Sequence, residues 1–471
     1  MKMKFRSFYQ YIQLLIIILF TLISVNAKAA PVANASPIII NDNAAWCWFQ
    51  DERAIIHHGQ LYVGSVASKL GTNGAERGGD IEVARYPLDH SHPSVVNIMH
   101  DGLQDDDHNV PALLALPNND ILAVYSKHNV DRKIRYRMLS PSLQAKKDQW
   151  LPEIAMTRKD KITYANLFRL SDENQGKGRI YNFYRGINFN PSFDVSDDNG
   201  NTWSQGQHFI TNQGRPYVKY ISNNKDKIHF VTTEQHPRVF NNSIYHGYIK
   251  NGKVYNSFHE QVHDLSDGPV TTDKLTKVYQ GGKDNVAWTV DLHLDQEGNP
   301  YTVISVQVND GQKNRHKGEK HGDDMRYYYA NLQTPKWWQL GQDPSWQVEE
   351  IAYAGSRLYD QEQDYTGLAA LDPSNKNIMI ISTNADPVTG QPLISRADNQ
   401  RHWELYKGLR EQNGKWTWSA LTSNSSEDNL RPIIPINNES DDLYLLWMKG
   451  RYVTYQNIDT KVVMQVNPKS L

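Results

Sequence analysis

The sequence predicts an all-β protein, a seven-bladed β-propeller built from four-stranded antiparallel blades. Short apolar runs alternate with Gly, Asn, Asp and Pro turns through the chain after its first 36 residues, and no convincing amphipathic helix interrupts them. Paired runs recur as hairpins with a spacing of about 50 to 75 residues, and further strand-like segments follow most pairs. A four-stranded unit that repeats around an axis is a propeller blade, and seven units fall within the usual range.

The first 29 residues have the features of a secretory signal peptide. They begin with basic residues, continue with an apolar run at 14–23 and end near Ala27-Lys28-Ala29, a plausible cleavage tripeptide. The apolar run is too short to span a bilayer comfortably. We therefore expect residues 30–471 to form a single propeller domain that is secreted or periplasmic and has no membrane span.

Seven hairpins are expected in order along this domain, each made of two apolar runs joined by a turn. The pairs are 54–56 with 61–64, 110–116 with 121–126, 164–170 with 179–185, 217–221 with 228–233, 287–294 with 300–305, 366–371 with 377–382, and 431–436 with 442–447. Segments such as 133–138, 243–249, 325–330 and 403–408 supply strands that follow them. These segments account for the outer part of each blade.

One turn carries a more specific pattern. Ser196, Asp198, Gly200, Thr202 and Trp203 fit the Asp-box, Ser-x-Asp-x-Gly-x-Thr-Trp. Asp and Gly suit a tight turn between outer strands, and the Trp is expected to pack into the blade. We interpret the Asp-box as a folding element without a catalytic role.

Composition narrows the function classes. A hydrophobic content of 39% and a mean hydropathy of -0.65 exclude a helical membrane protein. Loss of the four basic residues of the leader changes the formal charge from -2 to -6, which argues against nucleic acid as a partner. An anionic substrate would then need a local basic pocket. The single Cys47 excludes an internal disulfide, and its neighbours Trp46, Trp48 and Phe49 predict a buried, apolar role.

The second hairpin is the strongest candidate for a functional site. His108 precedes its first strand and His128 follows its second, so a hairpin places both imidazoles on one rim of a sheet. The acidic run at 105–107 is expected to be a solvated turn, in preference to a Ca²⁺ site.

Several short motifs together resemble one family. Ala45-Trp46-Cys47-Trp48-Phe49-Gln50-Asp51, the Asp-His-Asn that ends at Asn109, Phe183-Tyr184-Arg185-Gly186, Arg215-Pro216-Tyr217 and Ser243-Ile244-Tyr245 are similar to segments of the BNR/Asp-box propellers of polysaccharide lyases. The resemblance is to ulvan lyases of the seven-bladed propeller type, and it covers essentially the whole mature chain. It implies eliminative cleavage of ulvan, a sulfated polymer of rhamnose and uronic acids.

Such a lyase needs a cation that neutralises the uronate carboxylate, a base for the proton on C5 and an acid for the departing O4. Aligning the hairpins gathers His108, His128, Tyr164 and Arg185 on one face of two adjacent blades. We expect Arg185 to neutralise the carboxylate with assistance from His128. His108 and Tyr164 are then the base and the acid. His108 is our choice of base, and the reverse order stays open because C5–H and O4 lie differently in glucuronic and iduronic units.

Two further groups are predicted around this site. Arg215, Tyr217 and Tyr220 open the fourth hairpin and are expected to extend the rim as substrate contacts, with Arg431 at the like position of the seventh. A separate set of histidines suits a structural Zn²⁺ that pins a long loop, namely His246, His259 and His263, with His236 upstream. No organic cofactor is expected.

Two other functions fit an Asp-box propeller. One is a glycoside hydrolase of the sialidase type, which needs three arginines on one carboxylate and a Tyr/Glu pair, a set that no spacing in this chain selects. The other is a propeller that binds glycans without catalysis.

Overall fold

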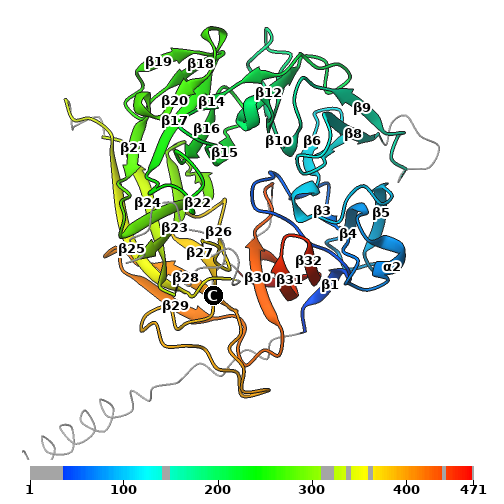
Figure 1. The fold of residues 1–471 in the computed structure, drawn as a ribbon, viewed down its shortest axis with the longest axis vertical. Coiled ribbons are helices and arrows are strands. Elements are labelled where there is room, and N and C mark those ends of the chain that lie inside the picture. Colours follow the sequence, from blue (N-terminus) through cyan, green and yellow to red (C-terminus); the bar gives the residue numbers. More distant parts are fainter. Residues whose placement is uncertain are drawn as a thin grey trace, which may run out of the picture. The chain divides into compact units, whose positions relative to one another are not determined.

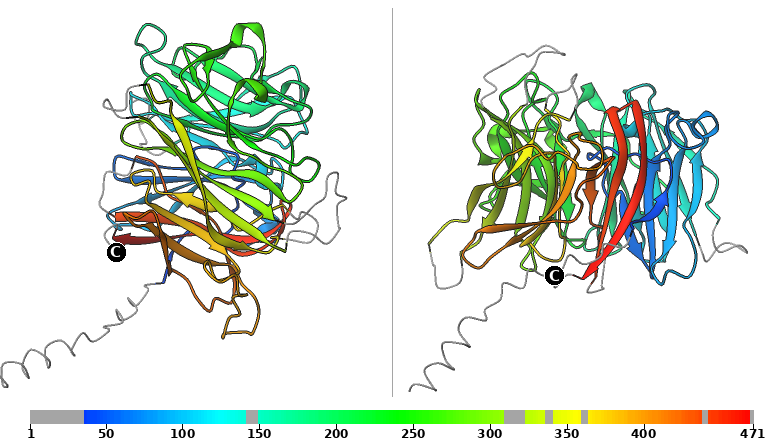
Figure 2. Two further views of the ribbon diagram at one scale, coloured as in Figure 1. Left: turned by 90° about the vertical axis from the view of Figure 1, so that its left-hand side faces the viewer. Right: turned by 90° about the horizontal axis from the view of Figure 1, so that it is seen from below.

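The computed structural model describes residues 36–140, 149–308, 323–335, 341–358, 364–437 and 442–468, so the expected signal peptide lies outside the described residues. Within Ile38–Leu471, the strands form seven blades around a central axis, which confirms the predicted propeller (Figure 1). Side views show the strands running between the two faces of the ring (Figure 2). In the described ranges, no helix has the length and apolar character needed to cross a membrane.

In five of the blades, four antiparallel strands follow chain order from the centre outward. Blade 1 contains β2 (Ala54–His57), β3 (Gln60–Val66), β4 (Ile81–Pro87) and β5 (Val95–His100); blade 2 contains β6 (Ala112–Ala115), β7 (Ile121–Ser126), β8 (Lys133–Leu139) and β9 (Ile154–Thr157); blade 3 contains β10 (Thr163–Leu170), β11 (Arg179–Arg185), β12 (Pro191–Ser196) and β13 (Gln207–His208); blade 5 contains β22 (Asn285–Leu294), β23 (Pro300–Val308), β24 (Met325–Gln333) and β25 (Ser345–Gly355); blade 6 contains β26 (Ala369–Leu371), β27 (Ile378–Thr383), β28 (Glu404–Arg410) and β29 (Trp416–Ala420). Their first strands pack on the first strands of adjacent blades, so apolar side chains fill the spaces between the sheets.

Blade 4 carries additional strands, and its third strand takes a separate partner at each end. The blade contains β15 (Val218–Ser222), β16 (Ile228–Thr232), β17 (Ile244–Lys250), β18 (Lys253–Tyr255), β19 (Gln261–Asp264) and β21 (Thr276–Tyr279). One end of β17 pairs with β18 and the other with β21. Short elements complete the described chain: β14 (Ile210–Thr211), paired in parallel with β20 (Val270–Thr271), and α2 (Gly74–Arg77), η1 (Asp107–Asn109), η2 (Ile187–Phe189), η3 (Leu265–Asp267) and η4 (Thr272–Lys274).

Blade 7 closes the ring by joining both ends of the domain. Its strands run from the centre as β30 (Asp428–Ile433), β31 (Asp442–Thr454), β32 (Asn457–Pro468) and β1 (Ile38–Asn41). β1 pairs antiparallel with β32, so the first strand of the domain hydrogen-bonds to its last. Radial repetition of the blades leaves only short, protected sheet edges.

The Asp-box forms the turn between β12 and β13, the outer strands of blade 3. Asp198 accepts hydrogen bonds from the backbone N–H and hydroxyl of Thr202 at 2.8 and 2.6 Å. Gly200 adopts φ +87°, which favours glycine, and its carbonyl accepts the indole N–H of Trp203 at 3.1 Å. The Trp203 ring packs edge-on to Tyr136 of blade 2. The predicted folding role therefore has a direct structural basis.

The loop between β1 and β2, residues 42–53, occupies the centre of the ring, and we call it the central segment. It hydrogen-bonds to six blades, through Val66, Leu113, Leu167, Lys219, Thr289 and Arg431. The indoles of Trp46 and Trp48 donate to the backbone carbonyls of Arg431 and Thr289. The backbone amides of Leu113 in blade 2 and Leu167 in blade 3 donate to backbone carbonyls of the central segment. Contacts to so many blades fix the loop and the rims around it.

A buried ion pair anchors the far end of the central segment. Lys219 Nζ lies 2.6 Å from Asp51 Oδ2 and also donates to the Trp48 carbonyl at 2.8 Å. The Lys219 side chain is 1% exposed and that of Asp51 is 7% exposed. Burial raises the pKa of Asp51, and the charge of Lys219 opposes that shift. A carboxylate at this depth depends on its ammonium partner.

We predict that Lys219→Met destabilises the fold by roughly 3–5 kcal/mol, because it leaves the buried Asp51 charge with only the more distant Arg53 guanidinium, at 3.8 Å. Lys283→Met is the matched control, since its side chain is 74% exposed, and it should change stability by no more than about 0.5 kcal/mol. Denaturant unfolding of both variants measures the difference. Equal effects of the two substitutions would contradict the anchoring role of the pair.

Candidate active site

One buried carboxylate holds two imidazoles on the rim of blade 2. His108 Nδ1 lies 2.8 Å from Asp106 Oδ1, and His128 Nδ1 lies 2.9 Å from Asp106 Oδ2. The two rings stack with centroids 3.8 Å apart and an angle of 7° between their planes. Because η1 precedes β6 and His128 follows β7, the hairpin places both histidines together, as the sequence predicts. Since both Nδ1 atoms face the carboxylate, both Nε2 atoms remain for other partners.

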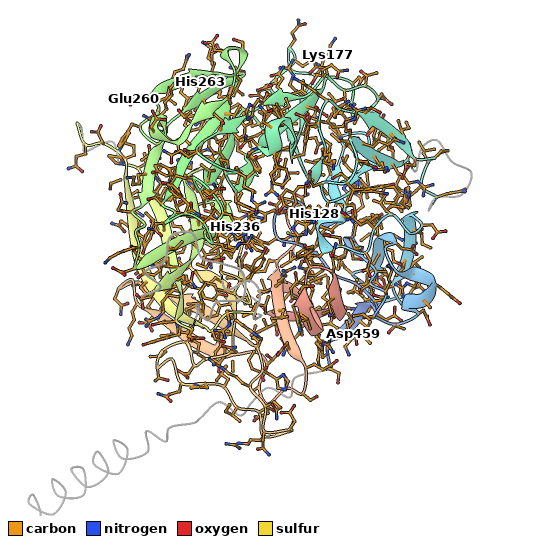
Figure 3. All side chains as sticks on the ribbon, in the orientation of Figure 1. His128, Lys177, His236, Glu260, His263 and Asp459 are labelled. Carbon is orange, nitrogen blue, oxygen red and sulfur yellow. The ribbon has the colours of Figure 1, made fainter. Side chains whose placement is uncertain are left out.

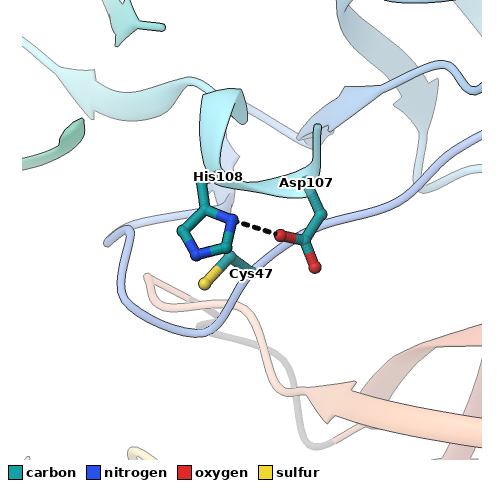
Figure 4. Close-up of side chains that lie close together, drawn as sticks. All are labelled: Cys47, Asp107 and His108. Carbon is teal, nitrogen blue, oxygen red and sulfur yellow. Dashed lines mark ion pairs between the residues drawn. The ribbon is translucent and has the colours of Figure 1, made fainter. Parts of the chain in front are cut away.

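A second buried carboxylate ties this turn to blade 7. Asp107 Oδ1 lies 2.8 Å from His108 Nδ1, as Figure 4 shows. Asp107 Oδ2 accepts from Arg431 Nη1 at 2.6 Å and from the Tyr452 hydroxyl at 2.7 Å. Asp107 and Arg431 are each 1% exposed. Arg431, predicted as a rim contact for substrate, is therefore a buried partner of Asp107, and the acidic run is not a solvated turn at these positions.

These charges separate the two imidazoles in pKa. Burial opposes a charge on His108, but the acidic groups around it, Tyr164 and Cys47 and then the carboxylates of Asp106 and Asp107, raise its pKa well above the ordinary value. Burial and the charge of His108 lower the pKa of His128, and Asp106 only partly offsets them. Of the two stacked imidazoles, His108 is therefore the one that binds an additional proton more readily.

Tyr164 lies next to this pair because β10 begins with a bulge. Its φ of +72° is in the left-handed region, and the register between β10 and β11 shifts after Thr163. The Tyr164 ring faces that of His108 at 5.5 Å and 24°. Strain of this kind at a non-glycine residue is concentrated at functional sites. Burial raises the pKa of the Tyr164 hydroxyl, and the charges of Arg185 and His108 act in the opposite direction.

Arg185 is a buried cation held by aromatic rings. Its Cζ lies 4.8 Å from the ring centroid of Tyr164, 4.6 Å from that of Tyr217 and 4.8 Å from that of Phe189. The residue is 4% exposed. Burial opposes its charge, and the Tyr164 and Tyr217 phenols raise its pKa. Within the described ranges it has no ion pair with a carboxylate, although buried guanidinium groups usually have one.

The predicted substrate contacts divide into two groups. Tyr217 lies in the site. Burial raises the pKa of its hydroxyl, but the charges of Arg185 and Arg215 lower this pKa by more, so the net shift is downward. The Arg215 guanidinium lies 5.8 Å from the Tyr217 ring. Tyr220 is instead a core residue, since its ring stacks on Phe183 at 4.4 Å within an apolar cluster between blades 3 and 4. Tyr220 also lines a small cavity together with Tyr164, Arg185 and Tyr217, so its contact with substrate stays a prediction.

The predicted zinc ligands are not gathered. His246 is enclosed by His229 at 3.1 Å and Ser257 at 2.8 Å, whereas His259 contacts the Tyr248 hydroxyl at 3.2 Å. His263 lies on β19, separated from β17 by β18, and its Nε2 donates to the Gly268 carbonyl at 3.0 Å. Figure 3 shows His263 at the outer side of the ring and His128 near its centre.

Two groups of side chains elsewhere in the described ranges have ligand atoms close enough to hold a metal ion, and both include His108. One group is Asp106, His108 and His128, and the other is Cys47, Asp107 and His108. The ligand atoms within each group lie within 4.8 Å of one another. The predicted set on blade 4 does not form such a group.

Sequence reasoning missed three side chains of the site. Asp106 joins the imidazoles, Tyr455 presents its ring edge-on to His108 and His128 at 5.3 and 5.5 Å, and Gln456 donates to Asp106 Oδ2 at 3.0 Å. Tyr455 and Gln456 form the turn between β31 and β32. The run of three aspartates before His108 was a usable signal for Asp106, but the sequence has no local signal that brings the last hairpin to blade 2.

Comparisons with known proteins agree with this fold. Residues 61–343 match the model of a family described as BNR repeat-containing family member. Two solved structures of an ulvan lyase, titled as a new family of polysaccharide lyase, share 15% identity with the chain, and one is bound to -[GlcA(1-4)Rha3S]-. Each alignment covers 93% of this chain and 96% of that one, with TM-scores of 0.61 and 0.60. An α-L-arabinofuranosidase from Fusarium graminearum shares 13% identity, covering 76% of this chain and 92% of its own, with a TM-score of 0.39. A search of curated proteins found no match.

The charge on His108 predicts how its contribution to stability depends on pH. A folded pKa above the unfolded value stabilises the fold at low pH, and this contribution is lost as pH rises through the folded pKa. His108→Gln should therefore destabilise the protein more at about pH 6 than at about pH 9. Urea unfolding at both pH values measures the loss of stability, and His58→Gln, at an exposed histidine, is the control. A pH-independent difference for His108→Gln would contradict the charged state.

Proposed function

The chain belongs to the BNR repeat-containing family, and we propose that it is a polysaccharide lyase that cleaves ulvan at a uronic acid by β-elimination. The observation that carries the proposal is Arg185, a buried cation with no carboxylate partner in the described ranges, next to two imidazoles and a phenol. The fold shared with an ulvan lyase bound to a glucuronic acid repeat supports a uronate as the missing anion. Secretion, predicted from residues 1–29, suits a polymeric substrate.

Arg185 supplies the first requirement of the reaction. Its planar guanidinium can bind a carboxylate through two hydrogen bonds, and the rings of Tyr164, Tyr217 and Phe189 fix its position before substrate arrives. Neutralising the carboxylate stabilises the charge that develops when the C5 proton is removed. The guanidinium is already desolvated, so it does not lose hydration when the sugar binds.

His108 and Tyr164 supply the proton transfers. The base takes the C5 proton, the C5–H electrons form the C4=C5 double bond, the C4–O4 bond breaks, and the acid protonates O4. Because two carboxylates hold a proton on His108, its charge favours His108 as the acid and Tyr164 as the base, the reverse of our choice from sequence. Arg185 and charged His108 flank the Tyr164 phenol and oppose the rise in its pKa that burial causes. His128 is a second candidate base, because its lowered pKa keeps it neutral.

We predict that Arg185→Met lowers kcat/KM on ulvan by about 10²–10³-fold, because the developing negative charge loses its cation. The ultraviolet absorbance of the unsaturated uronate product measures the rate. Arg169→Met, on the same hairpin and bonded to the Lys177 carbonyl, is the matched control and should retain activity. Carboxyl-reduced ulvan should not be cleaved by the unmodified protein.

Two outcomes would contradict this function. Reducing ends without the ultraviolet absorbance would show hydrolysis, as a sialidase-like enzyme performs it. Ulvan binding that no substitution at His108 or Tyr164 affects, with no product formed, would favour a glycan-binding propeller.

A uronide that carries fluorine at C4 separates acid from base, because fluoride leaves without protonation. His108→Ala should therefore release fluoride from this compound at close to the unmodified rate while its turnover of ulvan falls by about 10²–10⁴-fold. Tyr164→Phe should lose both activities. Loss of fluoride release in His108→Ala, with retention in Tyr164→Phe, would reverse the assignment.

A further inference from the structure

The only cysteine of the chain lies behind the candidate active site. Cys47 Sγ, a carboxylate oxygen of Asp107 and a ring nitrogen of His108 lie within 4.8 Å of one another. Figure 4 shows the thiol on the imidazole side that faces away from the rim turn. All three residues are buried, at 2%, 1% and 8% exposure. Cys47 has no role in the proton transfers above.

One oxygen of Asp107 forms an ion pair with His108 but has no hydrogen bond, and it faces the same place. His108 Nδ1 lies 2.8 Å from both Asp106 Oδ1 and Asp107 Oδ1, but one N–H is donated to Asp106. Asp107 Oδ1 is left buried without a hydrogen bond, while Oδ2 serves Arg431 and Tyr452. A buried oxygen without a donor is costly unless a further ligand completes it.

We propose that Cys47, Asp107 and His108 form a binding site for a thiophilic divalent cation such as Zn²⁺. Thiolate, imidazole and carboxylate are the donors that Zn²⁺ prefers, and water can complete a tetrahedron. Ligand atoms around Zn²⁺ lie about 3.5 Å apart, given its usual bond lengths, so side-chain rotations close the remaining gap. Binding releases the thiol proton and the imidazolium proton to solvent, and no group is oxidised or reduced.

The site has a consequence for the proposed reaction, and this part of the inference rests on the proposed function. A His108 nitrogen that is bonded to the cation cannot exchange a proton with substrate, so the cation inhibits elimination. The group of Asp106, His108 and His128 competes for the same imidazole. The thiolate favours the Cys47 group, because soft sulfur ligands hold Zn²⁺ more firmly than a second imidazole.

Cobalt titration of the full chain tests the binding directly. Co²⁺ bound to a thiolate gives a near-ultraviolet charge-transfer band, which we expect in the unmodified protein and which added Zn²⁺ should abolish. Cys47→Ser and Cys47→Ala should both lack the band. The control His263→Asn, which removes a histidine from the outer strand β19 of blade 4, should keep it. The absence of the band in the unmodified protein, or its persistence in both Cys47 variants, would overturn the site.

Inhibition supplies the second readout. In Cys47→Ser, with inhibition measured against that variant's own rate without metal, the Zn²⁺ concentration for half-inhibition should rise at least about tenfold. Unchanged inhibition in Cys47→Ser would place the cation on Asp106, His108 and His128 and contradict the proposal. A protein that shows the cobalt band but does not cleave ulvan would keep the metal site and refute only the lyase function.

Discussion

The candidate site depends on two buried carboxylates at a three-residue turn. Asp106 and Asp107 are each 1% exposed, and an isolated carboxylate at that depth would cost several kcal/mol. The imidazoles compensate Asp106, and Arg431 compensates Asp107. Each partner is fixed in return, because moving it would leave a buried charge unpaired. The electrostatic requirement of two aspartates therefore sets the positions and the charge of the groups that face substrate.

The ring and its central segment make this arrangement rigid. The Cys47 amide donates to the Asp107 carbonyl, and the Gln50 side chain donates to the His108 carbonyl at 2.5 Å, so the central segment supports η1 from behind. From the opposite side, the Asp107 amide donates to the Tyr455 carbonyl of blade 7. Left-handed backbone at Tyr164 and Arg431 is tolerated because packing and ion pairs hold both side chains.

Local patterns revealed the part of the architecture that local sequence determines. Alternating apolar runs and turn residues located all seven hairpins, and the hairpin register brought His108 to His128 and Tyr164 to Arg185. Closure by β1 and β32 was not foreseen, because it joins residues from opposite ends of the domain. The acidic run was misjudged because runs of charge are usually solvated, and only the distant Arg431 permits its burial. The zinc set failed for a related reason, since neighbouring strands determine which way a strand residue faces.

A crystal structure of the His108→Ala variant with a uronic-acid oligosaccharide tests the central claim most directly. Our account predicts a sugar carboxylate bound by the Arg185 guanidinium through two hydrogen bonds of about 2.7–2.9 Å, with C5 directed at the cluster of Tyr164 and the imidazoles. A carboxylate bound elsewhere on the propeller, with Arg185 still enclosed by its aromatic rings and without an anion, would contradict it.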